Sequence, residues 1–134
     1  SIYIEIKNRK GLAAMEGFDE SSPLKDSLRK VWHNSFKFVA ENRDYLEYHD
    51  QFLNSPYSHL IDDAQDTAVI QPILAAVESA ARNKVIKEVD FDILSAFVFS
   101  PITVLSNPRE GSKTKMTRKN IDTAFEMAWD AIKL

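Results

Sequence analysis

An uncharged stretch late in the chain constrains the fold more than any other feature. Residues 92–108 read DILSAFVFSPITVLSNP, and no side chain from Ile93 to Pro108 is charged, although 28% of the 134 residues are. The stretch is shorter than the roughly 18 apolar residues of a membrane helix, and Pro101 stands in its middle. A helix of this composition needs burial on more than one side.

A helix over residues 91–106 would carry two apolar faces. The face suited to the core comprises Phe91, Leu94, Val98, Ile102 and Leu105. The nearly opposite face comprises Ile93, Phe97, Ser100 and Val104. Because one core covers only one face, the pattern predicts either a second partner or a single central helix buried inside a monomer.

The last predicted helix, at residues 117–133, repeats this design. Its core stripe comprises Ile121, Phe125, Ala128 and Ile132. Its second stripe, mostly of small residues that permit close helix approach, comprises Ala124, Met127, Ala131 and Leu134. Two such helices from each of two subunits form a symmetric four-helix interface. We therefore expect a homodimer that buries Ile93, Phe97, Ser100, Val104, Ala124, Met127 and Ala131.

The remaining chain is also helical in its periodicity. Stripes at helical spacing predict further helices at residues 2–16, 24–40, 43–54 and 57–82. Together with the low content of turn formers, 3 Gly and 5 Pro, these stripes predict an all-α fold, a bundle of about six helices, and residues 1–134 as a single domain.

Two prolines punctuate these helices. Ser22 and Pro23 precede the second helix as a typical cap and first turn. Pro72 interrupts the fourth helix, because it removes one backbone hydrogen bond and crowds the preceding turn, so a kink or break is expected near Gln71. After this break the expected core stripe is Leu74, Val77 and Ala81.

The composition narrows the function classes. The net charge of −3, from 17 basic and 20 acidic residues, lacks the basic surplus of a nucleic-acid binder. The absence of cysteine excludes disulfides and thiolate metal sites. No zinc spacing, phosphate loop or nucleophile elbow is present, so we expect no enzyme, cofactor or metal. With no signal peptide and no membrane-length apolar run, we expect a cytoplasmic protein.

Four segments together resemble a known family. They are IYIEIKNRKGL (2–12), PLKDSLRKVWHNSFKFVAENRDYLEYHDQFLNSP (23–56), VIKEVDFDILSAFVFSPI (85–102) and NIDTAFEMAWDAIKL (120–134). Their order resembles the C-terminal regulatory domain of TetR-family transcription regulators. The resemblance implies that residues 1–16 are the helix joining this domain to an N-terminal helix-turn-helix, which this sequence lacks. Operator DNA would be contacted only through that missing domain, and the last two helices would form the dimer interface.

The resemblance also implies an effector cavity among the helices at 24–40, 43–54, 57–82 and 91–106. We expect its lining to include Trp32, Phe36, Tyr45, His49, Phe52, Ile61 and Phe99. Aromatic rings supply contact area, while His49 and Tyr45 orient a small, largely apolar effector with one or two polar groups.

Plainer interpretations remain open for several of these residues. Ordinary core packing would also explain Trp32 and Phe36, and His49 would then be a core histidine with its hydrogen bond satisfied. His33 falls on the opposite, polar face and is expected in solvent. The alternative function is a helical protein-interaction or dimerisation module without a small ligand, and a solid core would favour it.

Overall fold

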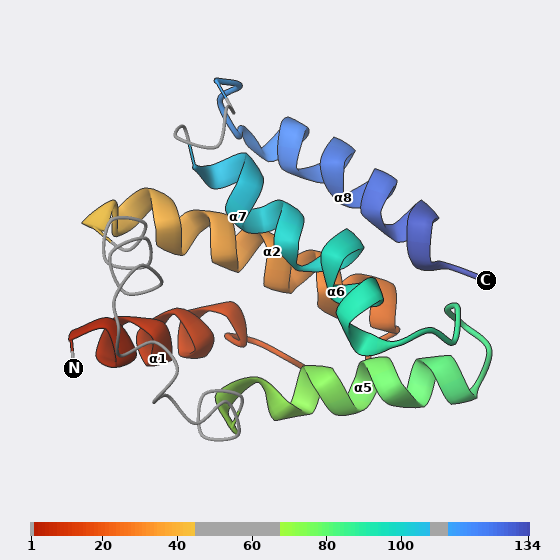
Figure 1. Cartoon of the computed structure of the whole chain (residues 1–134). Coiled ribbons are helices and arrows are strands. Elements are labelled where there is room, and N and C mark those ends of the chain that lie inside the picture. The colour runs from red at the N-terminus through yellow and green to blue at the C-terminus, as the bar shows by residue number, and fades with distance from the viewer. Residues whose placement is uncertain (1, 45–67, 108–112) are drawn as a thin grey trace.

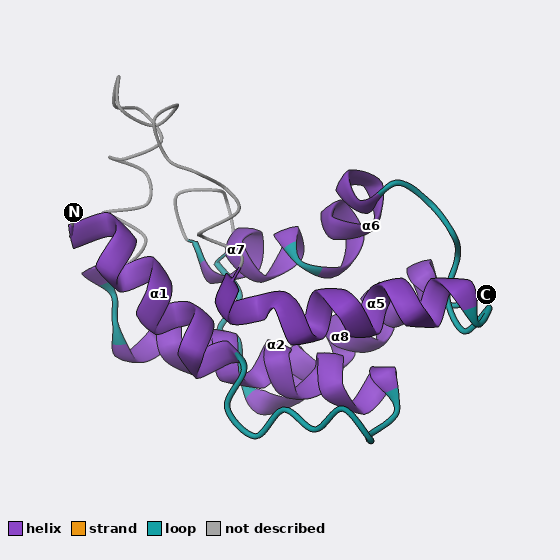
Figure 2. Ribbon diagram, turned by 90° about the horizontal axis from the view of Figure 1, so that it is seen from below, coloured by secondary structure: helices purple, strands orange, loops and turns teal. Residues whose placement is uncertain are grey.

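The computed structural model describes residues 2–44, 68–107 and 113–134 of the chain. The regular elements in these ranges are α1 (Ile2–Ala14), α2 (Leu24–Glu41), the 3-10 turn η2 (Ala68–Ile70), α5 (Gln71–Arg82), α6 (Phe91–Val98), α7 (Ser100–Ser106) and α8 (Arg118–Ile132). Figure 2 shows that the described part is built of helices joined by loops. The predicted all-α bundle of about six helices is confirmed. The helix predicted at 43–54, apart from its first two residues, and the first part of that at 57–82 lie outside the described residues.

Helix α2 is the centre of the bundle. It packs against α1, α5, α7 and α8, and Figure 1 shows α8 on one side of it and α1 and α5 on the other. Its buried positions recur every three or four residues, as a helix with a core-facing stripe requires. They are Ser27, Leu28, Val31, Trp32, Ser35, Phe36, Phe38 and Val39.

The connection from α1 to α2 is fixed by side chains of α2. Asn34 Nδ2 donates hydrogen bonds to the carbonyls of Ala14 (3.1 Å) and Glu16 (3.0 Å), and these satisfy acceptors that a helix end leaves free. Gly17 has φ +73°, and its carbonyl accepts a bond from Lys30 Nζ at 3.0 Å. The predicted Ser22 cap is wrong: Pro23 directly precedes α2, and no side chain caps the N-terminal end of this helix.

Pro72 lies at the start of α5 rather than inside a longer straight helix. The 3-10 turn η2 ends at Ile70 and α5 begins at Gln71 with Pro72 in its first turn, where a missing N–H costs nothing. The predicted break near Gln71 is therefore confirmed. The predicted stripe is shifted by one residue at two positions, because Ile73, Val77 and Ala80 are the buried residues of α5.

The uncharged stretch forms two helices, which corrects the single helix predicted over 91–106. α6 ends at Val98 and α7 begins at Ser100, with Pro101 in the first turn of α7. Since proline has no N–H, the backbone bond from residue 101 to Phe97 cannot form. Ile102 N–H, which would reach the Val98 carbonyl in a continuous α-helix, donates instead to the Phe99 carbonyl at 3.1 Å.

Helix α8 runs antiparallel to α6 and is held at both ends. Thr117 accepts a capping bond from the Asn120 N–H at 3.2 Å, as expected for this residue type. At the other end Lys87 Nζ donates to the carbonyls of Ala131 (2.8 Å) and Lys133 (2.9 Å), a favourable place for a cation. An antiparallel bridge between Ile86 and Lys133 completes the junction.

Candidate dimer face and effector site

The second apolar face predicted for the last helices is uncovered in the single chain. Phe97 is 54% exposed and Met127 is 70% exposed, and Ile93 and Val104 are also exposed. Four of the nine large apolar side chains that are exposed among the described residues therefore lie on this face. We call it the α6–α8 face and define it as Ile93, Phe97, Ser100, Val104, Ala124, Met127 and Ala131.

The inward sides of the same helices are buried as predicted, except that Leu105 is only half-buried against the core and Phe91 is exposed. Leu94, Val98 and Ile102 face the core from α6 and α7. The core residues of α8 are Ile121, Phe125, Ala128 and Ile132. Phe91, the first residue of α6, was also predicted in the core but is 48% exposed, and its ring lies 6.3 Å from that of Phe99.

Trp32 links the centre of the bundle to the break between α6 and α7. Its side chain is fully buried, and its indole N–H donates a 2.8 Å hydrogen bond to the Val98 carbonyl. Its ring packs 5.5 Å from Phe125 and 5.9 Å from Phe36 in tilted or edge-on geometry, an arrangement that aromatic quadrupoles favour.

The structure brings together only part of the predicted effector site. Trp32 and Phe36 lie side by side in the core, and Phe99 is half-buried against it. Tyr45, His49, Phe52 and Ile61 lie outside the described residues. The effector site as a whole thus stays a prediction.

An open depression of about 350 Å³ lies where the start of α1 meets the end of α2. Its lining includes Ile6, Arg9 and residues 40–44. None of these residues belongs to the predicted effector site, and the lining is mostly polar or charged, unlike a typical small-molecule pocket.

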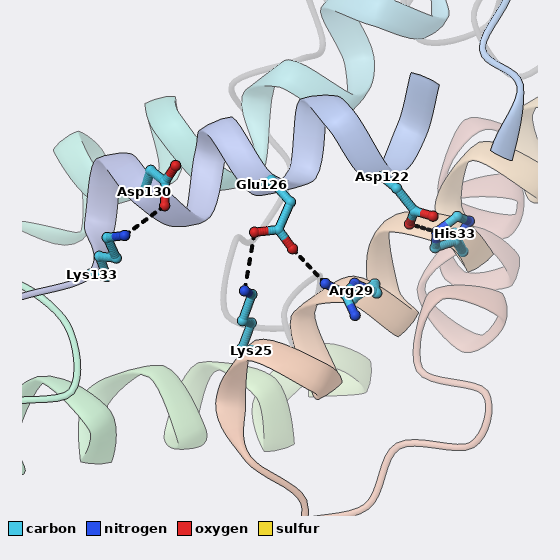
Figure 3. A network of polar contacts seen from close by, with 7 residues as sticks. All are labelled: Lys25, Arg29, His33, Asp122, Glu126, Asp130 and Lys133. Atoms are coloured by element: carbon cyan, nitrogen blue, oxygen red, sulfur yellow. Dashed lines mark hydrogen bonds and ion pairs between the residues drawn. The ribbon is translucent and has the colours of Figure 1, made fainter. Parts of the chain in front are cut away.

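Charged side chains form a second contact between α2 and α8 (Figure 3). Glu126 Oε2 lies 3.0 Å from Lys25 Nζ, and the other carboxylate oxygen pairs with Arg29. His33 Nε2 lies 2.6 Å from Asp122 Oδ1. The prediction that His33 lies in solvent is wrong, since its side chain is half-buried in this contact.

These contacts stabilise the charged forms of the α8 carboxylates. The hydrogen bond with His33 lowers the pKa of Asp122, and its partial burial acts in the opposite direction. The hydrogen bond from Lys25 lowers the pKa of Glu126, with a further contribution from Arg29. We call these pairs the ionic row: Lys25, Arg29 and His33 of α2 with Asp122 and Glu126 of α8. The Arg29 guanidinium also lies 5.4 Å from the centre of the Phe125 ring, so the ionic row borders the aromatic core.

The sequence carries a signal for this row. Basic side chains recur at every fourth position of α2, at residues 25, 29 and 33, and acidic ones recur likewise on α8, at residues 122, 126 and 130. Residues four apart share one helix face. Two such rows of opposite charge predict that the faces meet, although Asp130 pairs with Lys133 on its own chain end rather than with α2.

No helix among the described residues combines the length and apolarity needed to cross a membrane. No three metal-ligating side chains converge within residues 2–44, 68–107 and 113–134.

A family model described as tetracyclin repressor-like, C-terminal domain, matches residues 23–133. The chain belongs to this family. The family predicted from the four segments is therefore confirmed for this TetR-like domain. No curated protein matches it.

Two solved structures resemble the TetR-like domain in fold. A TetR family transcription regulator from Marinobacter aquaeolei VT8 superposes with a TM-score of 0.85 and 28% identity, over 98% of this chain and 69% of that one. A TetR family protein from Vibrio parahaemolyticus superposes with a TM-score of 0.71 and 18% identity, over 99% and 71% of the respective chains. The second likeness shows the fold alone.

Proposed function

We propose that this TetR-like domain is the homodimerisation and effector-binding part of a cytoplasmic transcription regulator, and not an enzyme. The main support for the proposed dimer is the α6–α8 face, which is uncovered in the single chain. Contiguous apolar surface on a protein marks an interaction site, and residues 93–107 bring no charge to it. Contact with operator DNA is assigned to a helix-turn-helix outside this sequence.

A second copy of the same chain fits this face. A two-fold interface is self-complementary, so each subunit must offer the same apolar patch. Phe97 and Met127 supply large flexible or aromatic contacts of the kind that dominate interface cores. Ala124 and Ala131 are small and permit close helix approach.

Replacement of Phe97 by Glu tests this dimer. We expect light scattering to give twice the monomer mass for the wild type at micromolar concentration, and Phe97→Glu to shift it toward the monomer. The reason is that the new carboxylate would be desolvated without a partner. Leu12→Glu is the matched control, because Leu12 is 63% exposed on α1, away from the face, and the dimer should persist. A monomeric wild type contradicts the proposal.

The effector half of the proposal is supported by family membership and by one unpaired polar group. Ser35 is buried on α2 beside Phe36, and its hydroxyl has no hydrogen-bond partner among the described residues. Buried polar groups without partners are rare and call for an explanation. A bound effector with a polar group would provide that partner.

A thermal-shift screen tests effector binding. Small apolar compounds with one or two polar groups should include some that raise the melting temperature, since a ligand stabilises the folded state that binds it. We expect His49→Ala and Ser35→Ala to weaken the shift while light scattering still reports a dimer. If both variants show the wild-type shift, this effector site is wrong.

A dimerisation module without a small ligand is the second candidate, and one observation favours it. The Trp32 N–H is already bonded to the Val98 carbonyl, and its ring is enclosed by other aromatic rings. Trp32 thus offers no free donor to an effector. A screen in which no compound raises the melting temperature would support this second function.

A further inference from the structure

We propose that Trp32 is a positioning residue for the dimer face: its indole N–H holds the bend between α6 and α7 and thereby sets the shape of the α6–α8 face. The inference rests on the proposed dimer, and no residue of that face contributes the bond itself. Trp32 is also predicted to line the effector cavity, and the positioning role is proposed in addition to that prediction.

The break leaves the Val98 carbonyl in need of a donor. Ile102 N–H bonds Phe99 instead, at 3.1 Å. Val98 has no exposed surface, so water does not reach its surroundings, and a buried carbonyl without a partner is costly. The Trp32 N–H, at 2.8 Å, is the donor that the structure provides.

The bond acts at the centre of the proposed interface. Ile93 and Phe97 lie on α6, before the break, while Ser100 and Val104 lie on α7, after it. The angle between the two short helices therefore decides whether these four side chains form one surface. Interfaces depend on such shape complementarity, so a change at Val98 is transmitted directly to Phe97 and Ser100.

Trp32 is itself held in place from several sides. Phe36 and Phe125 pack against its ring, and α2 is tied to α8 by the ionic row at residues 25, 29 and 33. The indole cannot follow a moving α6–α7 junction without disturbing this packing. The N–H is thus a fixed reference point for the bend rather than a mobile contact.

An isosteric replacement isolates the N–H from the packing of the ring. Trp129 is first replaced by Phe, so that Trp32 is the one tryptophan left in the chain. Trp32 is then replaced by β-(3-benzothienyl)alanine, whose ring has nearly the size of indole but carries sulfur in place of N–H. We expect the dimer Kd, measured by sedimentation, to rise about tenfold, as loss of one bond to a buried carbonyl implies. The unfolding midpoint of the same protein in urea is measured in parallel.

Ile73→Val is the control for general destabilisation. Ile73 is buried in α5, away from the break, so this variant should lower the unfolding midpoint and leave the dimer Kd unchanged. Trp32→Phe gives a second test in which both quantities should change.

The outcomes separate this inference from the proposed function. A dimeric protein whose Kd is unaffected by loss of the N–H, or is affected no more than by an equally destabilising Ile73→Val, overturns the positioning role alone. A monomeric parent protein overturns the proposed interface and the positioning role together.

Discussion

At the scale of single residues, the sequence predicted the buried residues correctly in helices that have a single apolar stripe facing the core. Ile121, Phe125, Ala128 and Ile132 are all buried as predicted, because spacings of three and four residues fix one side of a helix. In α5 the spacing also allowed the neighbouring register, and the structure buries Ile73 and Ala80 in place of Leu74 and Ala81. Which register wins depends on contacts between distant helices, and these are not encoded in local spacing.

The contact between His33 and Asp122 joins residues 89 positions apart and predicts a dependence of stability on pH. The pKa of Asp122 is lowered in the folded state from its ordinary value of 3.8. Its contribution to stability is therefore fully present above pH 3.8 and is lost as the pH falls through the lower folded value.

Asp122→Asn should remove this part of the pH dependence. We expect the urea midpoint of the wild type to fall more steeply than that of the variant as the pH drops below about 4. Glu88→Gln, in the exposed connection between α5 and α6, is the control and should leave the contribution of Asp122 in place. Parallel curves for the wild type and Asp122→Asn would show that the contact with His33 does not favour the charged carboxylate.

At the scale of elements, boundaries were predicted best where capping chemistry is local. Thr117 caps the start of α8 and Pro72 lies in the first turn of α5, as their residue types indicate. The end of α6 was not predicted, although Pro101 lies close after it in the sequence, because a proline inside an apolar helix can either bend that helix or divide it. The Trp32 bond to Val98 favours division, and no sequence pattern shows that bond.

The packing of α1 on η2 depends on a glycine. A Cβ atom added at Gly11 would lie 3.2 Å from Val69 Cγ1, closer than ordinary van der Waals contact. Gly11→Ala should gain about 0.5–1 kcal/mol of helix propensity but lose part of it to this contact. In a Val69→Ala background the contact is relieved, so the gain should be larger.

Chemical denaturation of the four variants in a double-mutant cycle measures this coupling. We expect Gly11→Ala to stabilise the Val69→Ala protein more than the wild type. Equal effects in both backgrounds would mean that α1 and η2 do not pack as closely as described.

At the scale of the whole molecule, the fold class and the family were predictable, while the site was predictable only in part. An all-α bundle follows from periodicity, and four ordered segments were enough to indicate the TetR family. The α6–α8 face was visible because its large apolar side chains, Ile93, Phe97, Val104 and Met127, are not needed in the core of one chain. The ionic row between α2 and α8 required the pairing of two helices that are distant in sequence.

The central claim is that two copies of this chain meet through the α6–α8 face. The chain has no cysteine, so a single spin label can be attached at Met127→Cys on the face, or at Leu12→Cys on α1 as a reference. Double electron–electron resonance then measures the distance between the labels of two copies. We expect a clear dipolar signal at both positions, with a much shorter distance at 127 than at 12. No dipolar signal at 127, or a shorter distance at 12, would contradict the central claim.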